Sequence, residues 1–478
     1  MVSLKTRILY GSGGAVYAVK EAAYSMFVLI FYTQVLGLSG TITGVVLSLA
    51  LIWDGITDPL VGGWSDKLRS RFGRRHPFLA LSILPLGLGF IGLFTPPQSV
   101  VENTTWLGSW LLFWTLWIRT FLTTFSIPHL ALSAEITSDY QERSNTMGAR
   151  MVFTFLFAVL LPAVGLLWIF SSNDGVDGRF VNANYPIYGA LSCVAVLVMG
   201  TLTTWGTRNY IVPSTTSGLA AKGPRGNMRA LLRDLVRTLE NKTFRYMIGY
   251  EIAAMVSWGT ISTLNILSWT YFWEFSATEV SIILALPSLV AIGLVMFTLR
   301  GLTARFQKHH LLQYALVALI LNCLWLYPAK MLGLFPQGNE TIPFVLNLVF
   351  MLIFMYCYLI RAITSYSIIS DITDEHELDH GLRQEAGFFA VLNFIAKFAA
   401  IFGPVYAGIA LDVIGLETGM LPGNVPLDTQ NGLVYAMGLG IIPALLVAVY
   451  FVLKINLSKA RVEDIQAQLR KRREQEAS

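Results

Sequence analysis

The strongest constraint on this chain is a series of apolar windows, each about as long as a membrane is thick. A helix needs about 20 apolar residues to cross a bilayer core of about 30 Å. The 478 residues contain twelve such windows, separated by turn residues and charged stretches. They lie near residues 8–36, 42–66, 77–96, 106–133, 147–170, 186–207, 244–272, 279–300, 311–334, 342–369, 386–415 and 431–453. The pattern predicts an all-α membrane protein with twelve transmembrane helices.

Composition agrees with this architecture and excludes several other classes of protein. Hydrophobic residues make up 54% of the chain and charged residues 13%, whereas soluble proteins carry about 25% charged residues. We therefore exclude a soluble enzyme, a disordered protein and a nucleic-acid-binding module, and we expect no nucleic acid as a partner. The three cysteines lie inside apolar windows, which indicates small buried side chains rather than a disulfide or zinc framework. The first window is too long for a cleavable signal peptide.

Basic residues are distributed unevenly among the segments that join the windows. Of the 34 Lys and Arg residues, 25 lie at the N-terminus, after the second and eighth windows, in a central linker or in the C-terminal tail. Because Lys and Arg are enriched in cytoplasmic loops, we expect both termini and the linker to be cytoplasmic. The protein is then a multi-pass protein of the plasma (inner) membrane.

The windows and charged stretches divide the chain into four parts. We expect a six-helix bundle at 1–207, a linker with a short amphipathic helix at 208–243, a second six-helix bundle at 244–455 and a charged cytoplasmic tail at 456–478. The tail has the pattern of a helix that lies in solvent or on the membrane surface. Two six-helix halves around a linker are typical of transporters built from repeats, with a substrate site near the bilayer midplane.

Two carboxylates stand one helical turn apart in the second window. Asp54 and Asp58 lie on one face of a helix, and like charges this close in a membrane cannot both ionise without compensation. A bound monovalent cation, a shared proton or a Lys or Arg from a neighbouring helix would each supply it. Pro59 cannot donate a hydrogen bond to the carbonyl of Gly55, which leaves that oxygen available to a cation. We interpret the pair as a cation site.

These acids belong to a set of motifs that runs along nearly the whole chain. The motifs occupy residues 31–39, 54–62, 65–66, 73–78, 127–128, 142–143, 150, 370–374, 383–389 and 397. In content and order they resemble the glycoside–pentoside–hexuronide:cation symporters of the major facilitator superfamily. The resemblance implies the fold of that superfamily, twelve transmembrane helices in two six-helix halves. It also implies a secondary active transporter rather than an enzyme.

The resemblance assigns roles to individual residues. Asp54 and Asp58 would bind the coupling Na⁺, Li⁺ or H⁺, with Thr123 contributing to the site. Arg150 would contact the sugar, and Lys397 would lie close to both sites. A structural ion pair of either basic residue with the acid pair is the alternative. We expect a small-molecule substrate and a monovalent cation as ligands, no cofactor or further metal, the lipid bilayer as surroundings, and a monomer.

The chain also departs from the family in the substrate site. Where galactoside carriers of the family hold sugar with acids, the aligned positions here are Ala18 and Ser126. Lys20 and Glu21 stand near the first position but on another face. A site that keeps Arg150 and Lys397 without those acids is more basic. This favours an anionic sugar such as a hexuronide or sulfo-sugar. A lysophospholipid, as carried by cation symporters of the same branch, is the alternative.

Further charged residues indicate a conformational lock at the cytoplasmic side. The resemblance and the charge clusters together predict ion pairs that break and re-form between the two halves; the alternative for the basic cluster is a role in membrane topology alone. The predicted members are Asp66, Arg74, Arg75, Asp371, Asp374, Arg383 and Glu385.

One motif points to a different chemistry. His376, Glu377 and His380 match H-E-x-x-H, in which two histidines bind zinc and the glutamate acts as general base. The segment lies in a predicted cytoplasmic loop with no clear third ligand. An intramembrane zinc protease is therefore the remote alternative. Glu251, inside the seventh window, has no assigned role.

Overall fold

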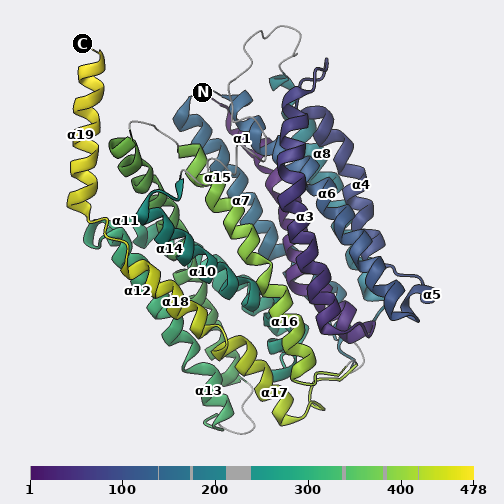
Figure 1. Ribbon diagram of the computed structural model, residues 1–478. Helices are drawn as coiled ribbons and strands as arrows, with labels where there is room; N and C mark the ends of the chain where they lie inside the picture. The colour runs from purple at the N-terminus through teal and green to yellow at the C-terminus, as the bar shows by residue number, and fades with distance from the viewer. Residues whose placement is uncertain are drawn as a thin grey trace. The chain divides into compact units, whose positions relative to one another are not determined.

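The computed structural model describes residues 2–137, 139–172, 176–211, 238–335, 341–380, 385–417 and 419–477, and most of these residues are helical (Figure 1). Most of the predicted linker at 208–243, with its predicted amphipathic helix, lies outside the described residues.

The first six apolar windows form long helices, as expected. The elements are α1 (Leu4–Gly11), α2 (Gly13–Ala22) followed by π-helical turns Ala23–Val28 and Phe31–Val35, α3 (Gly40–Lys67), α4 (His76–Phe94), α5 (Gln98–Val101), α6 (Thr104–Ile136), α7 (Tyr140–Val164) followed by the π-helical turn Gly165–Ile169, and α8 (Asn184–Gly206). Polar side chains cap the N-termini of several of these helices. Ser39, Asn103 and Asp139 accept hydrogen bonds from backbone N–H groups in the first turns of α3, α6 and α7.

The later windows form a second series of helices. The elements are α10 (Lys242–Leu267) followed by the π-helical turn Ser268–Phe272, α11 (Ala277–Arg305), α12 (Lys308–Cys323), α13 (Leu326–Met331), α14 (Thr341–His380), α15 (Glu385–Ala400), α16 (Phe402–Val413), α17 (Leu427–Val434) followed by the π-helical turn Tyr435–Leu439, α18 (Ile442–Leu453) and α19 (Lys459–Ala477).

Two sequence-based boundaries are wrong. Residues 371–380, predicted as a loop, continue α14, because charged residues do not end a helix and the first Gly or Pro after Pro343 is Gly381. The window 386–415 is divided into α15 and α16. The break lies at Ile401, just before Pro404, whose missing N–H cannot complete the helical ladder.

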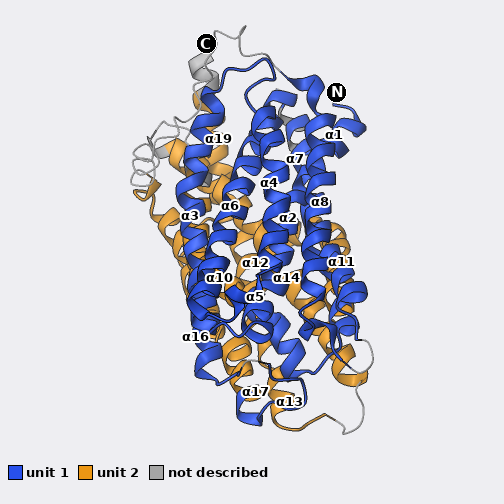
Figure 2. Ribbon diagram, turned by 90° about the vertical axis from the view of Figure 1, so that its right-hand side faces the viewer, with its two compact units in different colours: residues 1–227, 262–281, 404–429 blue, residues 228–261, 282–403, 430–478 orange. Residues whose placement is uncertain are grey.

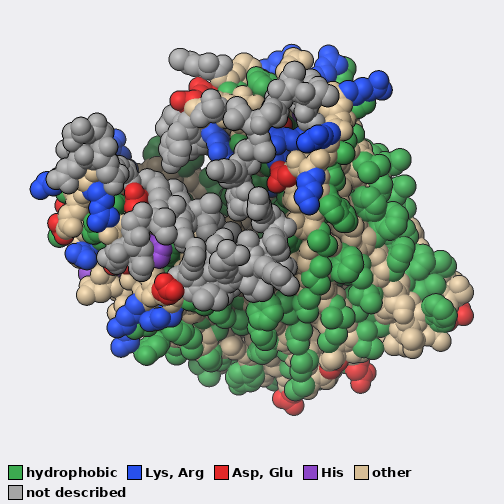
Figure 3. Space-filling model, turned by 45° about the horizontal axis from the view of Figure 1, so that its top comes forward, with side chains coloured by type: hydrophobic (Ala, Val, Ile, Leu, Met, Phe, Trp, Pro, Cys, Tyr) green, Lys and Arg blue, Asp and Glu red, His purple; other side chains and the backbone are tan. Residues whose placement is uncertain are grey.

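Eleven helices within the described ranges are long and apolar enough to cross a membrane. The remaining predicted window, 244–272, forms α10 and its π-helical turn. It carries several polar side chains, among them the buried Glu251, Ser257 and Asn265. Figure 3 shows hydrophobic side chains over the flanks of the helices and Lys and Arg side chains gathered at the end that faces the viewer.

The helices pack as two compact units (Figure 2). Unit 1 comprises residues 1–227, 262–281 and 404–429, and unit 2 comprises residues 228–261, 282–403 and 430–478. In unit 1, α4 packs against α6 and α8, α2 against α7, and α3 against α6. Two segments that the sequence assigns to the second half, 262–281 and 404–429, therefore belong to the packing of unit 1. The predicted division of the chain into two six-helix bundles stays a prediction.

In unit 2, α12 packs against α14 and α18, and α14 packs against α19. The tail is helical, as predicted, but it does not lie free in solvent. Ile465 and Leu469 on α19 are buried in the apolar core of this unit. Gln466 donates a hydrogen bond to Asp374 at 3.2 Å. An apolar stripe on α19 is what fixes it to α14.

Candidate cation and substrate site

The two acids of α3 face α6, and each has a different partner there. The hydroxyl of Thr123 donates a hydrogen bond to Oδ1 of Asp58 at 2.9 Å. Asp54 forms an ion pair with Arg119. Next to this ion pair, the indole of Trp53 donates to the hydroxyl of Thr120 at 2.8 Å. These polar contacts set the register of α3 against α6, and they bring the predicted cation ligands Asp58 and Thr123 together.

Arg119 is a residue that the sequence-based prediction missed. Its side chain is 5% exposed, and its guanidinium carbon lies 5.7 Å from the centre of the Tyr24 ring. An arginine inside an apolar window is costly without a partner, and that signal was present in the fourth window. A basic side chain from a neighbouring helix, one of the alternatives left open for the acid pair, therefore compensates the charge of Asp54. That side chain is Arg119 and neither Arg150 nor Lys397.

A second charge pair lies on α2. Lys20 is buried and forms an ion pair with Glu21, and its ammonium lies 4.8 Å from the centre of the Tyr17 ring. Ala18, on the same helix, is fully buried. Ser126 on α6 is half-buried. Of these two predicted substrate positions, only Ser126 has exposed surface in this structure.

The two predicted basic substrate ligands lie in different units. Arg150 is half-buried on α7 in unit 1, and Lys397 is half-buried on α15 in unit 2. The helix α7, which carries Arg150, runs very close to α2. A Cβ added to Gly14 of α2 would lie only 2.2 Å from the carbonyl oxygen of Arg150. This glycine allows the two backbones to approach. The roles of Arg150 and Lys397 stay predictions.

Three predicted members of the charge lock form a network in unit 1. Arg75 bonds to Asp66 and donates to the hydroxyl of Ser65. Arg74 and Arg75 both donate to Glu135 at the end of α6, at 2.8 and 3.3 Å. Glu135 was not predicted, because its place opposite the two arginines depends on how α6 packs against α3. Each of these contacts lies inside unit 1.

The predicted lock residues of unit 2 also have partners within their own unit. Lys308 donates to both oxygens of Asp371 at 2.8 and 2.7 Å, while Asp374 accepts from Gln466. Arg383 lies outside the described residues, and Glu385 is placed only as the first residue of α15. Ion pairing between the two halves stays a prediction.

The N-terminus is tied to the start of α7 near the unit 1 network. The N–H of Val2 and the guanidinium of Arg7 donate to the same oxygen of Glu142 at 3.0 and 2.9 Å. These hydrogen bonds, first the one from Val2, lower the pKa of Glu142. The tie is therefore present above the ordinary pKa of a glutamate and is lost as the pH falls through the lowered value.

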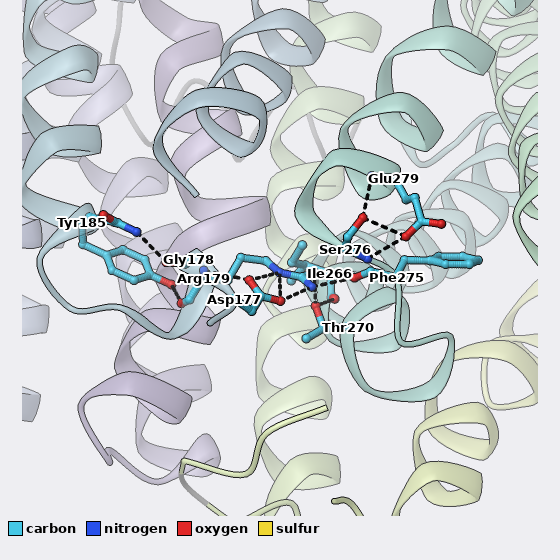
Figure 4. Close-up of polar contacts among 10 residues, drawn as sticks. Asp177, Gly178, Arg179, Tyr185, Ile266, Thr270, Phe275, Ser276 and Glu279 are labelled. Carbon is cyan, nitrogen blue, oxygen red and sulfur yellow. Dashed lines mark hydrogen bonds and ion pairs between the residues drawn. The ribbon is translucent and has the colours of Figure 1, made fainter. Parts of the chain in front are cut away.

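A buried arginine organises the opposite end of unit 1 (Figure 4). Arg179 is 1% exposed and forms an ion pair with Asp177. It also donates to the hydroxyl of Thr270 and the carbonyl of Phe275, both at 2.6 Å. The side chain of Arg179 thus joins the short helix Gly178–Phe180 to the segment that follows α10. Arg179 is one of the nine Lys and Arg residues that lie outside the five basic segments of the sequence.

The same end contains a close crossing of α3 and α16. Asp412 accepts hydrogen bonds from the hydroxyl of Ser39 and the N–H groups of Gly40 and Thr41, at 2.9, 2.9 and 2.8 Å. This caps the N-terminus of α3 with a negative charge, a favourable arrangement. Each added Cβ on Gly44 or Gly408 would lie 2.2 Å from a carbonyl oxygen of the other helix.

The comparisons with known proteins identify the family. The family of MFS/sugar transport proteins matches residues 9–459. The chain belongs to this family. It is therefore a secondary active transporter of the major facilitator superfamily and not an enzyme.

Several relatives of this transporter are named as symporters. The putative glycoside/cation symporter YagG of Escherichia coli K12 is 24% identical over 99% of this chain and 96% of its own length. The sodium-dependent lysophosphatidylcholine symporter 1-A of Danio rerio is 21% identical over 98% of this chain and 89% of its own. They confirm the predicted resemblance to glycoside–pentoside–hexuronide:cation symporters.

Solved structures confirm the fold of the transporter. The nucleoside transporter NupG has a TM-score of 0.63 at 16% identity, covering 95% of this chain and 99% of its own. The D-xylose-proton symporter has a TM-score of 0.62 at 14% identity, covering 95% of this chain and 98% of its own. At this identity the likeness establishes the fold alone.

The H-E-x-x-H segment of the transporter lies in the last turns of α14. His376 is 3% exposed, and its ring lies 5.1 Å from the ring of Phe388, edge to face. The side chain of His380 lies outside the described residues. Within the described residues, no group of three or more His, Cys, Asp or Glu residues could hold a metal.

Glu251 has a partner in the interior of unit 2. The carboxylate lies 3.9 Å from the guanidinium of Arg361, with side-chain exposures of 10% and 5%. Arg361 also donates to the hydroxyl of Tyr250 at 2.9 Å, and its guanidinium carbon lies 5.0 Å from the centre of the Tyr358 ring. The group ties α10 to α14.

This pair leads to a prediction for stability. Removing one partner leaves a buried charge unpaired, which costs about 3–5 kcal/mol. We expect Arg361→Met to lower the unfolding temperature of the detergent-solubilised transporter strongly, and Glu251→Gln/Arg361→Met to recover most of the loss. Tryptophan fluorescence during heating measures it, with the exposed Arg305→Met as control. Equal losses in the single and double variants would contradict the pairing.

Proposed function

We propose that this transporter couples a monovalent cation, Na⁺ or H⁺, to the uptake of a sugar or glycoside by alternating access. The contact between Asp58 and Thr123 carries the proposal, because it presents a carboxylate and a hydroxyl to one point within two membrane-spanning helices. Oxygen ligands suit hard cations, and an ionisable group at membrane depth marks an ion pathway by default. The name of YagG, a putative glycoside/cation symporter, supports the same function.

The substrate that we propose is anionic, such as a hexuronide or a sulfo-sugar. Arg150 and Lys397 would hold its acidic group, since arginine binds carboxylates and sulfates in a bidentate geometry. Ser126 would contact a sugar hydroxyl. Members of the family that carry a neutral galactoside are expected to have an acid at the position of Ser126, where it would bind the sugar. The fully buried Ala18 would act by leaving space rather than by contact.

A lysophospholipid is the second candidate substrate. The observation that favours it is the match to the Danio rerio symporter over 98% of this chain. The two substrates share an anionic group but differ in the apolar tail. Competition by a detergent-like lipid but not by a sugar would identify the lysophospholipid.

We further propose that the protein is a monomer in the plasma (inner) membrane, with both termini in the cytoplasm. The charge distribution along the chain supports this orientation. The networks around Asp66 and Asp371 would then lie at the cytoplasmic side. We propose that they break and re-form during transport.

A ligand screen tests the proposed function. We expect a hexuronide or a sulfo-sugar to raise the unfolding temperature of the purified transporter more in Na⁺ than in K⁺, or more at low pH than at high pH. By linkage, the substrate must then increase the affinity for the cation by the same factor. A neutral galactoside and lysophosphatidylcholine serve as comparison ligands. Stabilisation that is independent of both Na⁺ and pH for every ligand would contradict a symporter.

A further inference from the structure

A long groove runs along the surface of unit 1 between α4 and α8, and it shares no residue with the proposed cation and substrate site. Its volume is about 850 Å³. Residues from His76 to Leu84 line it on α4, and residues from Leu197 to Arg208 line it on α8 and the turn that follows. Because an α-helix rises about 1.5 Å per residue, the stretch on α4 is about 12 Å long. The groove therefore extends over most of one leaflet, which is half of a bilayer core of about 30 Å.

The walls of this groove are mostly apolar and open to the surroundings of the protein. Leu84 and Trp205 line the groove and are exposed. On the same two helices, Leu81 and Val194 are exposed as well. In a chain that crosses a membrane, an apolar surface of this kind faces lipid rather than water. The space between the walls is therefore suited to an acyl chain.

One end of the groove is flanked by two arginines. Arg208 lines this end, and its guanidinium carbon lies 4.5 Å from the centre of the Trp205 ring. Arg71 stands beside it, with its guanidinium carbon 4.7 Å from the centre of the ring of Phe72, which also lines the groove. Both arginines are exposed. Within the described ranges, neither takes part in an ion pair, and the described residues that line the groove include no Asp or Glu.

We propose that the groove binds an anionic phospholipid, with an acyl chain along α4 and α8 and the phosphate held by Arg71 and Arg208. The charges are complementary, because guanidinium groups bind phosphate through paired hydrogen bonds. Basic pockets between membrane helices recognise anionic headgroups in this way. In the orientation proposed above, the groove opens to the cytoplasmic leaflet, where anionic lipids are found. The inference concerns binding alone and does not require that the chain transport a particular substrate.

Thiol labelling of the detergent-solubilised transporter tests this site. The native cysteines are buried, so Ala80→Cys places one accessible thiol in the groove. We expect dioleoylphosphatidylglycerol to slow its reaction with N-ethylmaleimide at least about fivefold, since the labelling rate falls as the site fills. Dioleoylphosphatidylcholine should slow it less than about twofold. Leu88→Cys, exposed on the same helix but outside the groove, should respond equally to both lipids. Thr201→Cys on α8 is a second reporter if Ala80→Cys does not fold.

Variants of the two arginines show whether the headgroup is the cause. Arg71→Gln/Arg208→Gln should remove the difference between the two lipids, whereas the exposed Arg305→Gln should keep it. Equal protection by both lipids in the parent, or selectivity that survives in the double variant, would overturn the proposal. Protection by glycerol 3-phosphate alone would mean that the groove binds a free phosphate and not a lipid. A thiol that is already protected without lipid, and unaffected by its addition, would mean that the chain itself covers the groove. Each of these last two results also overturns it.

Discussion

Asp58→Asn should abolish cation-stimulated uptake while leaving the fold intact. The amide oxygen of Asn can still accept the hydrogen bond from Thr123, so the packing of α3 against α6 is kept. What is lost is the negative charge that we assign to the coupling ion. We expect a loss of at least about 100-fold in uptake driven by an imposed cation gradient, which corresponds to about 2.7 kcal/mol.

Uptake into proteoliposomes with an imposed Na⁺ or pH gradient measures this effect. Thr123→Val removes one oxygen ligand and should cost less, about five- to tenfold. Glu102→Gln removes an exposed acid beyond the end of α5 and serves as the matched control. Unchanged uptake and unchanged ion dependence in Asp58→Asn would show that the coupling site lies elsewhere.

The sequence predicted the acid pair because its members are neighbours on one helix. The spacing of Asp54 and Asp58 and the periodicity of α3 place them on one face without knowledge of the fold. Their partners could not be derived in this way. Arg119 and Thr123 each lie 65 residues from their acids in the chain, and only the packing of α3 against α6 brings them together.

The same limit applies to the charged residues at the helix ends. The sequence marked Asp66, Arg74 and Arg75 as a cluster but gave no reason to include Glu135 from the end of α6. The length of α14 was underestimated because a change from apolar to charged residues was interpreted as a loop. Polarity reports where a membrane ends, whereas the end of a helix is determined by Gly, Pro and capping residues.

Gly44→Ala should block the close crossing of α3 and α16. A Cβ at Gly44 would lie 2.2 Å from the carbonyl oxygen of Pro404, and the obstacle is backbone that cannot rotate away. Small residues allow helices in membranes to approach in this way. An ordinary contact needs at least about 3.4 Å, so the helices must separate by about 1 Å. The hydrogen bonds of Asp412 to the start of α3 would be lost with this separation.

We expect Gly44→Ala to reduce transport at least about tenfold, because alternating access requires this end to close in each cycle. The protein should remain folded, since the crossing is a small part of unit 1. Gly62→Ala is the matched control on the same helix. Its Cβ would meet only Ile127, at an ordinary 3.7 Å, so uptake should be unchanged.

Cysteine labelling shows whether the crossing itself has opened. Thr33 is 3% exposed and lines the same pocket as Asp412 at this end of unit 1. The native Cys193, Cys323 and Cys357 are all buried. Thr33→Cys should react slowly with a water-soluble thiol reagent in the parent and in Gly62→Ala, but at least about tenfold faster in Gly44→Ala. Full transport and slow labelling in Gly44→Ala would mean that α3 and α16 do not need this close contact, and that closure at this end depends on the contacts of Arg179 instead.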